Sequence, residues 1–256
     1  MKPLRSYVER DYRAWHEGRR LRYFQVRIKQ SDLAIGVDIE SYSDSLMNLC
    51  RNHLIRLRSE LEEYIKLQPL FQTALLPIGL RGDAPEIAKR MNRAAHQARV
   101  GPMAAVAGAI AEMVGEQLTS RCQHVVVENG GDIFLKSSAE RTVAVFAGES
   151  RFSYRIGIKI PGSDQGLGIC TSSGTVGHSL SLGCADAVVV KAATAALADA
   201  VATGAGNMVE SKADLVKAID FARDISGVSG VLAIKGEQLA AWGEMEIVPL
   251  KRTEST

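Results

Sequence analysis

Two adjacent glycines stand in the middle of the chain, within the segment Glu128-Asn129-Gly130-Gly131-Asp132. Glycine allows backbone N–H groups to approach a ligand closely, which suits a phosphate group. The same pattern is also a strong signal for the tight turn of a β-hairpin. Taken alone, the segment favours the hairpin turn, with ligand binding as the alternative. The residues that would bind the ligand are Asn129, Gly130, Gly131 and Asp132.

The segment 168–183 is rich in small polar residues. Eleven of its sixteen residues are Gly, Ser, Thr or Cys, and it contains one imidazole, His178. A loop of hydroxyl groups and free N–H groups can bind an anion or a phosphorylated ligand. A structural loop has little need for so many hydroxyl groups, so this segment favours function. Its candidate binding residues are Ser172, Ser173, Gly174, Thr175 and His178.

Asp199 and Thr203 lie four residues apart in a segment that is otherwise almost entirely Ala and Gly. Side chains at this spacing share one face of a helix. A carboxylate and a hydroxyl group supply two of the oxygen ligands of Mg²⁺, which takes others from backbone, water and phosphate. The alternative is an ordinary helix C-terminal turn in which Thr203 bonds to a carbonyl. The segment alone does not decide between the two.

The four cysteines, Cys50, Cys122, Cys170 and Cys184, are widely spaced. The absence of a CxxC pair argues against a zinc site or a disulfide framework. Because His178 lies between them in the sequence, Cys170 or Cys184 is a candidate nucleophile, and these three are the candidate catalytic residues. An isolated cysteine is more often a small buried apolar residue, and that interpretation is favoured.

The composition is that of a globular protein. Of 256 residues, 46% are hydrophobic and 23% are charged, which excludes a disordered, collagen-like or coiled-coil chain. The net charge is +2, but residues 1–29 hold nine Lys and Arg against three acidic residues. Residues 1–22 are therefore expected to form a basic arm that leads into the first strand or packs on a partner subunit in a homo-oligomer. Nucleic-acid binding is the less favoured alternative.

The apolar runs are too short for a membrane protein. None approaches the ~20 residues that span a bilayer. The first residues lack the apolar region of a signal peptide, and thiols without such a signal are typical of a reducing compartment. We expect a cytoplasmic protein with no membrane association.

Helical and strand patterns occur in separate runs. Helical spacing covers 44–65, with Ser43 or Asp44 as the cap, and also 85–98, 103–118, 192–203 and 215–225. Strand patterns cover 24–28, 33–39, 125–127, 133–136, 142–146, 154–160, 167–171, 231–234, 239–242 and 245–248. The segment 188–190 fits either a short strand or the start of a helix. Strands that follow strands predict an α+β fold with largely antiparallel sheet. We expect a single domain over 1–256, with 77–84 as the one plausible subdomain seam.

Taken together and in this order, these segments resemble the ApbE superfamily, which includes flavin transferases and FAD-hydrolysing proteins. In that family a Gly-Gly turn, a Thr-Ser-Gly loop, a His-containing segment and a late Ala-Asp-Ala helix with a threonine form an FAD and Mg²⁺ site. The matching residues are Gly130–Asp132, Ser172–Gly174, His178, Ala198–Ala200 and Thr203. Val100–Ala109 and Ser173–Ser181 are more similar to an ApbE-like branch found in bacteria and archaea. The resemblance covers roughly residues 20–250.

The resemblance implies an ApbE-like α+β fold that binds FAD or a related phosphate-bearing nucleotide, with Mg²⁺ held by Asp199 and Thr203. Two family features are missing. His178 is followed by Ser179–Gly183, without the family's Asp-Pro, and Ala105–Ala111 lacks the family's lysine. Flavin-nucleotide transfer, hydrolysis and non-catalytic binding therefore all stay open.

A second activity is implied by relatives in anaerobes that are connected with sulfur incorporation into homocysteine. In that hypothesis Cys170 or Cys184, beside His178, carries a persulfide. The distribution of small residues instead favours the nucleotide. Ala and Gly together account for 55 residues, and many lie in 101–118, 130–131, 168–183 and 198–206. We interpret these segments as backbone brought close to a phosphate-bearing ligand.

Overall fold

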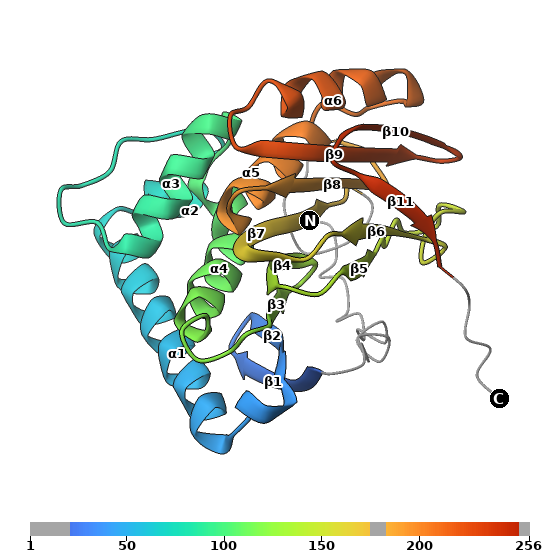
Figure 1. The fold of residues 1–256 in the computed structure, drawn as a ribbon. Coiled ribbons are helices and arrows are strands. Elements are labelled where there is room, and N and C mark those ends of the chain that lie inside the picture. The colour runs from blue at the N-terminus through green and yellow to red at the C-terminus, as the bar shows by residue number, and fades with distance from the viewer. Residues whose placement is uncertain (1–20, 175–182, 251–256) are drawn as a thin grey trace.

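The computed structural model describes residues 21–174 and 183–250. In this part of the chain eight of the strands form one sheet. They are β1 (Leu21–Ile28), β2 (Ser31–Asp38), β3 (Val125–Asn129), β4 (Asp132–Ser137), β7 (Ser163–Ser172), β8 (Ala187–Ala192), β9 (Val228–Lys235) and β10 (Gln238–Gly243). Their order is β1-β2-β3-β4-β7-β8-β9-β10, and every neighbouring pair is antiparallel. The predicted antiparallel α+β class is confirmed (Figure 1).

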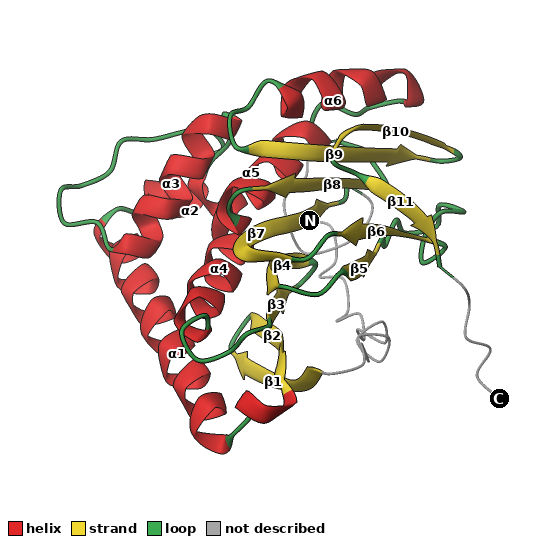
Figure 2. Cartoon of the chain, in the orientation of Figure 1, coloured by secondary structure: helices red, strands yellow, loops and turns green. Residues whose placement is uncertain are grey.

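A smaller sheet and a layer of helices lie on opposite faces of the large sheet (Figure 2). The small sheet has the order β11-β6-β5, with β5 (Arg141–Ala144), β6 (Ile156–Ile160) and β11 (Glu246–Pro249). The helices are α1 (Asp44–Leu67), α2 (Leu70–Thr73), α3 (Glu86–Ala98), α4 (Val106–Leu118), α5 (Ala195–Gly206) and α6 (Leu215–Arg223). Short 3₁₀ turns cover Ile39–Ser41, Pro102–Ala105 and Lys212–Asp214.

Side chains of the large sheet alternate between two apolar cores. Val125 and Val127 pack against the helices, whereas Val126 packs with the small sheet, because successive strand residues point to opposite faces. On β4 this alternation directs Ile133 toward the small sheet and Phe134 toward the helices. Asp132, two residues before Phe134, therefore lies on the helix side.

The central strand β8 is buried on both faces along its whole length. Such a strand is almost continuously apolar and carries no alternating pattern, so the sequence 188–190 fitted a strand or a helix equally well. The structure shows the strand. The helix that follows was predicted to begin at 192 but begins at Ala195. Thr194 sets this start, since its hydroxyl oxygen accepts the N–H of Leu197 at 3.2 Å.

Two other helix starts differ in how they are capped. Of the two predicted caps, Ser43 and Asp44, it is Ser43 that caps α1, through the N–H of Leu46. The helix predicted over 103–118 begins with the 3₁₀ turn Pro102–Ala105, and α4 proper starts at Val106 with no capping bond from the side chain of Ala105. Val106 donates its N–H to the carbonyl of Met103 within this turn, and the N–H groups that follow need partners from elsewhere in the molecule.

Two segments were expected to mark the organisation of the chain, the seam at 77–84 and the basic arm. The segment 77–84 connects α2 to α3, and one core includes residues from both sides of it, such as Leu61 and Ile87. Of the basic arm expected over 1–22, residues 1–20 lie outside the described residues.

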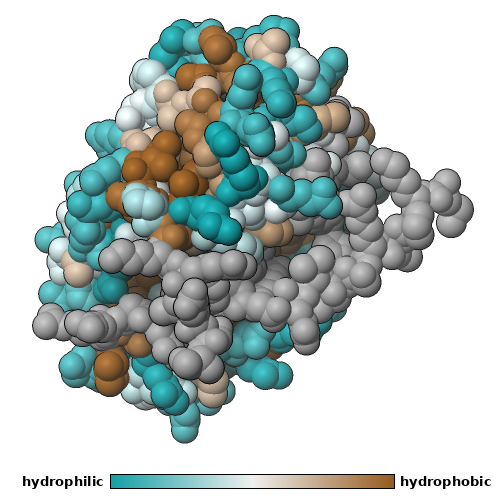
Figure 3. All heavy atoms as spheres, turned by 90° about the vertical axis from the view of Figure 1, so that its right-hand side faces the viewer, coloured by the Kyte–Doolittle hydropathy of each residue, from teal (hydrophilic) through white to brown (hydrophobic). Residues whose placement is uncertain are grey.

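No helix in the described ranges is both long and apolar enough to cross a bilayer. On the side at the right of Figure 1, hydrophobic side chains gather toward the middle of the face, among hydrophilic ones (Figure 3).

Candidate functional site

The Gly-Gly segment is the turn between β3 and β4, which confirms the hairpin interpretation. Asn129 pairs with Asp132 across the turn, and both glycines have positive φ, 73° at Gly130 and 108° at Gly131. The N–H of Gly131 bonds to the Glu128 carboxylate at 3.0 Å. A Cβ at Gly131 would meet no atom of residues 21–174 or 183–250 within 4 Å, so with respect to these residues the turn also borders open space.

The first turn of α4 lies beside this hairpin and receives polar contacts from two distant segments. The side-chain amide of Asn129 donates to the carbonyl of Ala107 at 3.1 Å. Asp199, on α5, accepts the N–H of Gly108 at 2.9 Å and also that of Ala107. Asp199 thus supplies the cap that Ala105 lacks, and its charge suits the positive end of the helix dipole.

Asp132 and Asp199 are near enough for their charges to interact. Asp199 as a residue keeps some exposure, but its carboxylate is enclosed by protein. Burial raises the pKa of Asp199 well above its usual range, and the negative charge of Asp132 raises it further. Asp132 is itself 8% exposed. Two carboxylates in one enclosed place are stabilised by a shared proton or by a cation.

Cys170 lies on the same face of the sheet, on β7. It is completely buried, and its thiol donates to the carbonyl of Ala195 at 3.3 Å. Burial raises the pKa of this thiol well above its usual range, and the charges of Asp132 and Asp199 raise it further. Because the thiolate is the nucleophile, these surroundings favour a core role for Cys170.

The end of β7 places Ser172, in the described part of the hydroxyl-rich segment, beside the C-terminal end of α5. Ser172 is buried, and its hydroxyl oxygen would be 3.6 Å from a Cβ at Gly206. Gly174 donates its N–H to Ala185 at 2.9 Å, while Ser173 is half-buried. Thr203 is half-buried one helical turn after Asp199, within α5. Thr175 and His178 lie outside the described residues.

Cys184 differs from the other three cysteines. Cys50, Cys122 and Cys170 are buried, whereas Cys184 is exposed. The N–H of Cys184 bonds to the Val209 carbonyl at 2.6 Å, and its own carbonyl accepts the Lys235 ammonium group. The backbone of Cys184 is thus held in place while its thiol faces solvent.

A thiol-reactive disulfide reagent should separate these cysteines. In the folded protein we expect one fast-reacting thiol, Cys184, because the other thiols are inaccessible and burial raises the pKa of Cys50, for example, to about 12. The measurement is the amount of leaving thiol that the reagent releases per protein chain, and the rate of its release, at neutral pH. The fast phase should vanish in Cys184→Ser and persist in Cys170→Ser. A fast phase that persists in Cys184→Ser would contradict this assignment.

The small residues have a different role from the one expected. A Cβ at Gly108 would lie 2.2 Å from the Ala195 carbonyl oxygen, and one at Gly168 would lie 2.3 Å from the Ala195 Cα. Gly174 and Gly183 are similarly close to backbone of other segments. Most of this glycine backbone therefore approaches other parts of the chain rather than an external ligand, and among the segments highlighted above Gly131 is the clear exception.

The described residues also contain a cavity of about 280 Å³. It is lined by Glu112, Glu116, Thr119, Phe134, Lys136, Asp164, Gly166, Ala193 and Thr194, none of which was a predicted site residue. Glu112 is the residue that the sequence analysis missed. Glu112 stands inside the otherwise apolar run 106–114, and this was the available signal, because a carboxylate buried in such a run needs a partner.

Within residues 21–174 and 183–250, no three His, Cys, Asp or Glu side chains are grouped as a metal site would require. A cation near Asp199 would therefore need hydroxyl, backbone, water or ligand oxygens as well. This requirement is compatible with Mg²⁺, which commonly binds through one or two carboxylates plus substrate phosphates.

The fold is that of the ApbE flavin transferases. A flavinyl transferase ApbE of Pseudomonas stutzeri superposes with a TM-score of 0.58 at 11% identity, covering 87% of this chain and 94% of that one. A point mutant of the flavin transferase ApbE from Vibrio cholerae gives 0.56 at 14% identity, covering 88% and 97%. At these identities the similarity shows the fold alone.

The chain belongs to the family described as "AbpE bacteria", whose model matches residues 13–232. Similar relatives are archaeal UPF0280 proteins. The Methanococcus aeolicus protein is 40% identical over 226 residues, covering 86% of this chain and 90% of its own. The Methanocella arvoryzae protein is 41% identical over 198 residues, covering 77% and 80%. The resemblance expected from the sequence motifs is confirmed.

Proposed function

We propose that this protein binds FAD or a related phosphate-bearing nucleotide together with Mg²⁺, beside the β3–β4 turn and the N-terminal turn of α4. The observation that carries the proposal is the enclosed pair of carboxylates, Asp132 and Asp199, next to the open space at Gly131. A divalent cation would neutralise this pair, and a phosphate group would complete the cation's oxygen ligands. The ApbE-type fold supports the choice of a flavin nucleotide.

Asp199 and Thr203 are the residues that would hold the cation. Two backbone N–H groups occupy part of the Asp199 carboxylate, but a carboxylate offers about four lone-pair positions. The same two bonds fix the direction of the side chain. Thr203, one turn further along α5, adds a neutral oxygen.

The rest of the site would bind and orient the nucleotide. Asn129 is tied to the carbonyl of Ala107, which joins the hairpin to α4. The positive-φ turn at Gly130 and Gly131 leaves room for a ligand, and the Ser172 hydroxyl lies at the other end of α5. When bound, Mg²⁺ would supply charge stabilisation at phosphate oxygens.

Thermal melts with combinations of FAD and Mg²⁺ test the proposal. A ligand at about 100 times its Kd stabilises the folded state by about 2.7 kcal/mol, which for a chain of this size raises Tm by about 5–10 °C. We expect this rise with FAD and Mg²⁺ together, and a much smaller one with FAD and EDTA. Absence of any rise with FAD, FMN or AMP, with or without Mg²⁺, would refute the proposal.

The same samples distinguish catalysis from binding. Chromatography of the incubated FAD shows whether FMN and AMP appear in a Mg²⁺-dependent way. Stabilisation without products identifies a binding protein, and products identify a hydrolase or transferase. The sulfur-transfer alternative needs an accessible thiolate, which the buried Cys170 does not provide. The sulfur-transfer alternative replaces the nucleotide proposal if two results are obtained. FAD does not change the Tm, and Cys184→Ser abolishes a sulfur-transfer activity of the protein.

A further inference from the structure

Helices α4 and α5 exchange carboxylate caps. Asp199 of α5 accepts N–H groups from the first turn of α4, at Ala107 and Gly108. In the opposite direction, Glu112 of α4 accepts the N–H of Ala196, in the first turn of α5, at 3.0 Å. Each helix therefore supplies a carboxyl group that accepts N–H groups at the positive, N-terminal end of the other.

The two helices touch where these caps are formed. A Cβ at Gly108 would lie 2.2 Å from the Ala195 carbonyl oxygen and 2.8 Å from the Asp199 Cβ. Such contact leaves little freedom for one helix to slide along the other without breaking both caps. Ala196 and Asp199 are only three residues apart on α5. Their bonds to α4 therefore depend on the same placement of α5 relative to α4.

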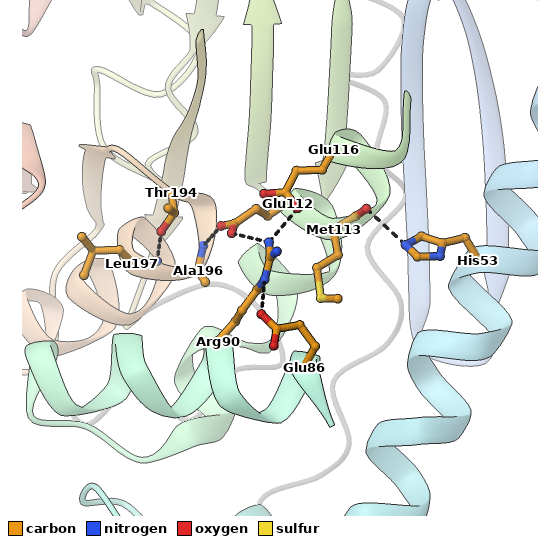
Figure 4. Close-up of polar contacts among 9 residues, drawn as sticks. All are labelled: His53, Glu86, Arg90, Glu112, Met113, Glu116, Thr194, Ala196 and Leu197. Carbon is orange, nitrogen blue, oxygen red and sulfur yellow. Dashed lines mark hydrogen bonds and ion pairs between the residues drawn. The ribbon is translucent and has the colours of Figure 1, made fainter. Parts of the chain in front are cut away.

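Glu112 is held in place by a third helix. It is 4% exposed, and its second oxygen accepts the guanidinium group of Arg90, on α3, at 2.9 Å. Arg90 also contacts Glu116 at 2.8 Å and Glu86 at 3.1 Å. Figure 4 shows Arg90 reaching from α3 to Glu112 and Glu116, with Ala196 on the far side of Glu112. Burial without these partners would make the Glu112 carboxylate costly.

We infer that Glu112, fixed by Arg90, is the positioning residue that holds α5 in register so that the Asp199 carboxylate stays at the N-terminal turn of α4. This inference concerns the arrangement of the chain itself. Its extension to metal affinity rests on the proposed function.

Glu116 provides a matched comparison. It lies on the same helix and contacts the same arginine, but it is largely exposed and no bond joins it to α5 in the described structure. Glu112→Gln and Glu116→Gln remove one charge each from the Arg90 cluster. Only the first disturbs the bridge between Arg90 and Ala196, because one amide oxygen must then serve both donors.

Amide hydrogen exchange tests the inference without any ligand. In Glu112→Gln we expect exchange at Gly108 to accelerate about tenfold relative to the amides of β8, because the charged hydrogen bonds that hold α5 are weakened. In Glu116→Gln the ratio should change by less than about twofold, as an exposed ion pair contributes little. Referring the rate to β8 removes any general loss of stability. An unchanged ratio in Glu112→Gln would overturn the positioning role.

A reciprocal experiment covers the case in which Glu112→Gln does not fold. If the caps are coupled, Asp199→Asn must accelerate exchange at Ala196, because coupling between two sites is mutual. Protection of Ala196 that is unaffected by Asp199→Asn would also contradict the inference.

Mg²⁺ titration then tests the functional extension. Loss of a residue that orients a metal ligand typically weakens affinity by 10–100-fold, and we expect about tenfold weaker Mg²⁺ binding in Glu112→Gln. Wild-type protein that binds no Mg²⁺ refutes the proposed function but leaves the exchange result to decide the positioning role. If Glu112→Gln accelerates exchange at Gly108 but binds Mg²⁺ as tightly as wild type, the extension to metal affinity is refuted and the positioning role stands.

Discussion

Replacing Asp199 with Asn is expected to abolish the Mg²⁺-dependent part of nucleotide binding. The change removes the charge that would attract the cation but keeps an oxygen that can accept an N–H group from α4. We expect Mg²⁺ affinity to fall about 100-fold, or about 2.7 kcal/mol of binding free energy. The measurement is the Tm rise of the Asp199→Asn variant across a Mg²⁺ series at fixed FAD. Thr203→Val should cause a smaller loss, since a neutral ligand is removed.

The control is the same Asp-to-Asn substitution at Asp38, a carboxylate distant from Asp199 in the sequence. Asp38 accepts the N–H of His124 at 2.9 Å, so Asp38→Asn also weakens a charged bond to backbone. This control should lose stability while keeping its full response to Mg²⁺. An equal loss of the Mg²⁺ response in both variants would show a general effect of instability, and an unchanged response in Asp199→Asn would remove Asp199 from the metal site.

The Asp199 carboxylate also predicts a pH dependence of the ligand-free protein. Its folded-state pKa is raised by burial and by Asp132, so the folded state binds its proton more tightly than the unfolded state does. Its contribution to stability is therefore present below the unfolded pKa and is lost as pH rises through the folded pKa. In Asp199→Asn this part of the profile should flatten. Since Mg²⁺ competes with the proton, wild-type metal affinity should increase over the same pH range.

A methyl group at Gly108 is expected to separate the two helices that form the site. The Cβ of Gly108→Ala would overlap the Ala195 carbonyl, which is backbone and cannot rotate away. Overpacking of this kind costs about 1–3 kcal/mol, partly offset by about 1 kcal/mol of better helix propensity. We expect a net loss of about 1 kcal/mol, seen as a Tm decrease of about 2–4 °C. Nucleotide binding should be lost together with stability, because Asp199 moves with α5.

Gly82→Ala is the matched substitution without a clash. A Cβ there would meet no atom of the described residues within 4 Å, so the change should alter Tm by no more than about 1 °C. Comparing the two variants isolates the contact between α4 and α5 from the general effect of replacing glycine. A Gly108→Ala protein as stable as Gly82→Ala would show that the helices are packed less closely than described.

Much of the fold follows from patterns that lie within short stretches of the chain. Ser43 caps the long helix α1 as predicted, and the turn at Gly130 and Gly131 joins two strands. These features depend on residues a few positions apart, where spacing alone defines the geometry. The helix start at Ala195 was missed by three residues because the preceding residues belong to a buried strand.

The sequence by itself determined most of the elements, the antiparallel α+β class and the family, because hydrophobic periodicity, turn residues and short motifs are local properties. Only the tertiary structure decided which of these elements meet. Asp199 reaches Gly108 across 91 residues, and Glu112 reaches Ala196 across 84. These contacts depend on the strand order and on two helix starts facing each other, which no local spacing encodes. The same packing showed that most glycines of the Ala- and Gly-rich segments lie against the backbone of another segment. Such a contact involves two segments that are distant in the sequence, so the sequence around one glycine does not reveal it.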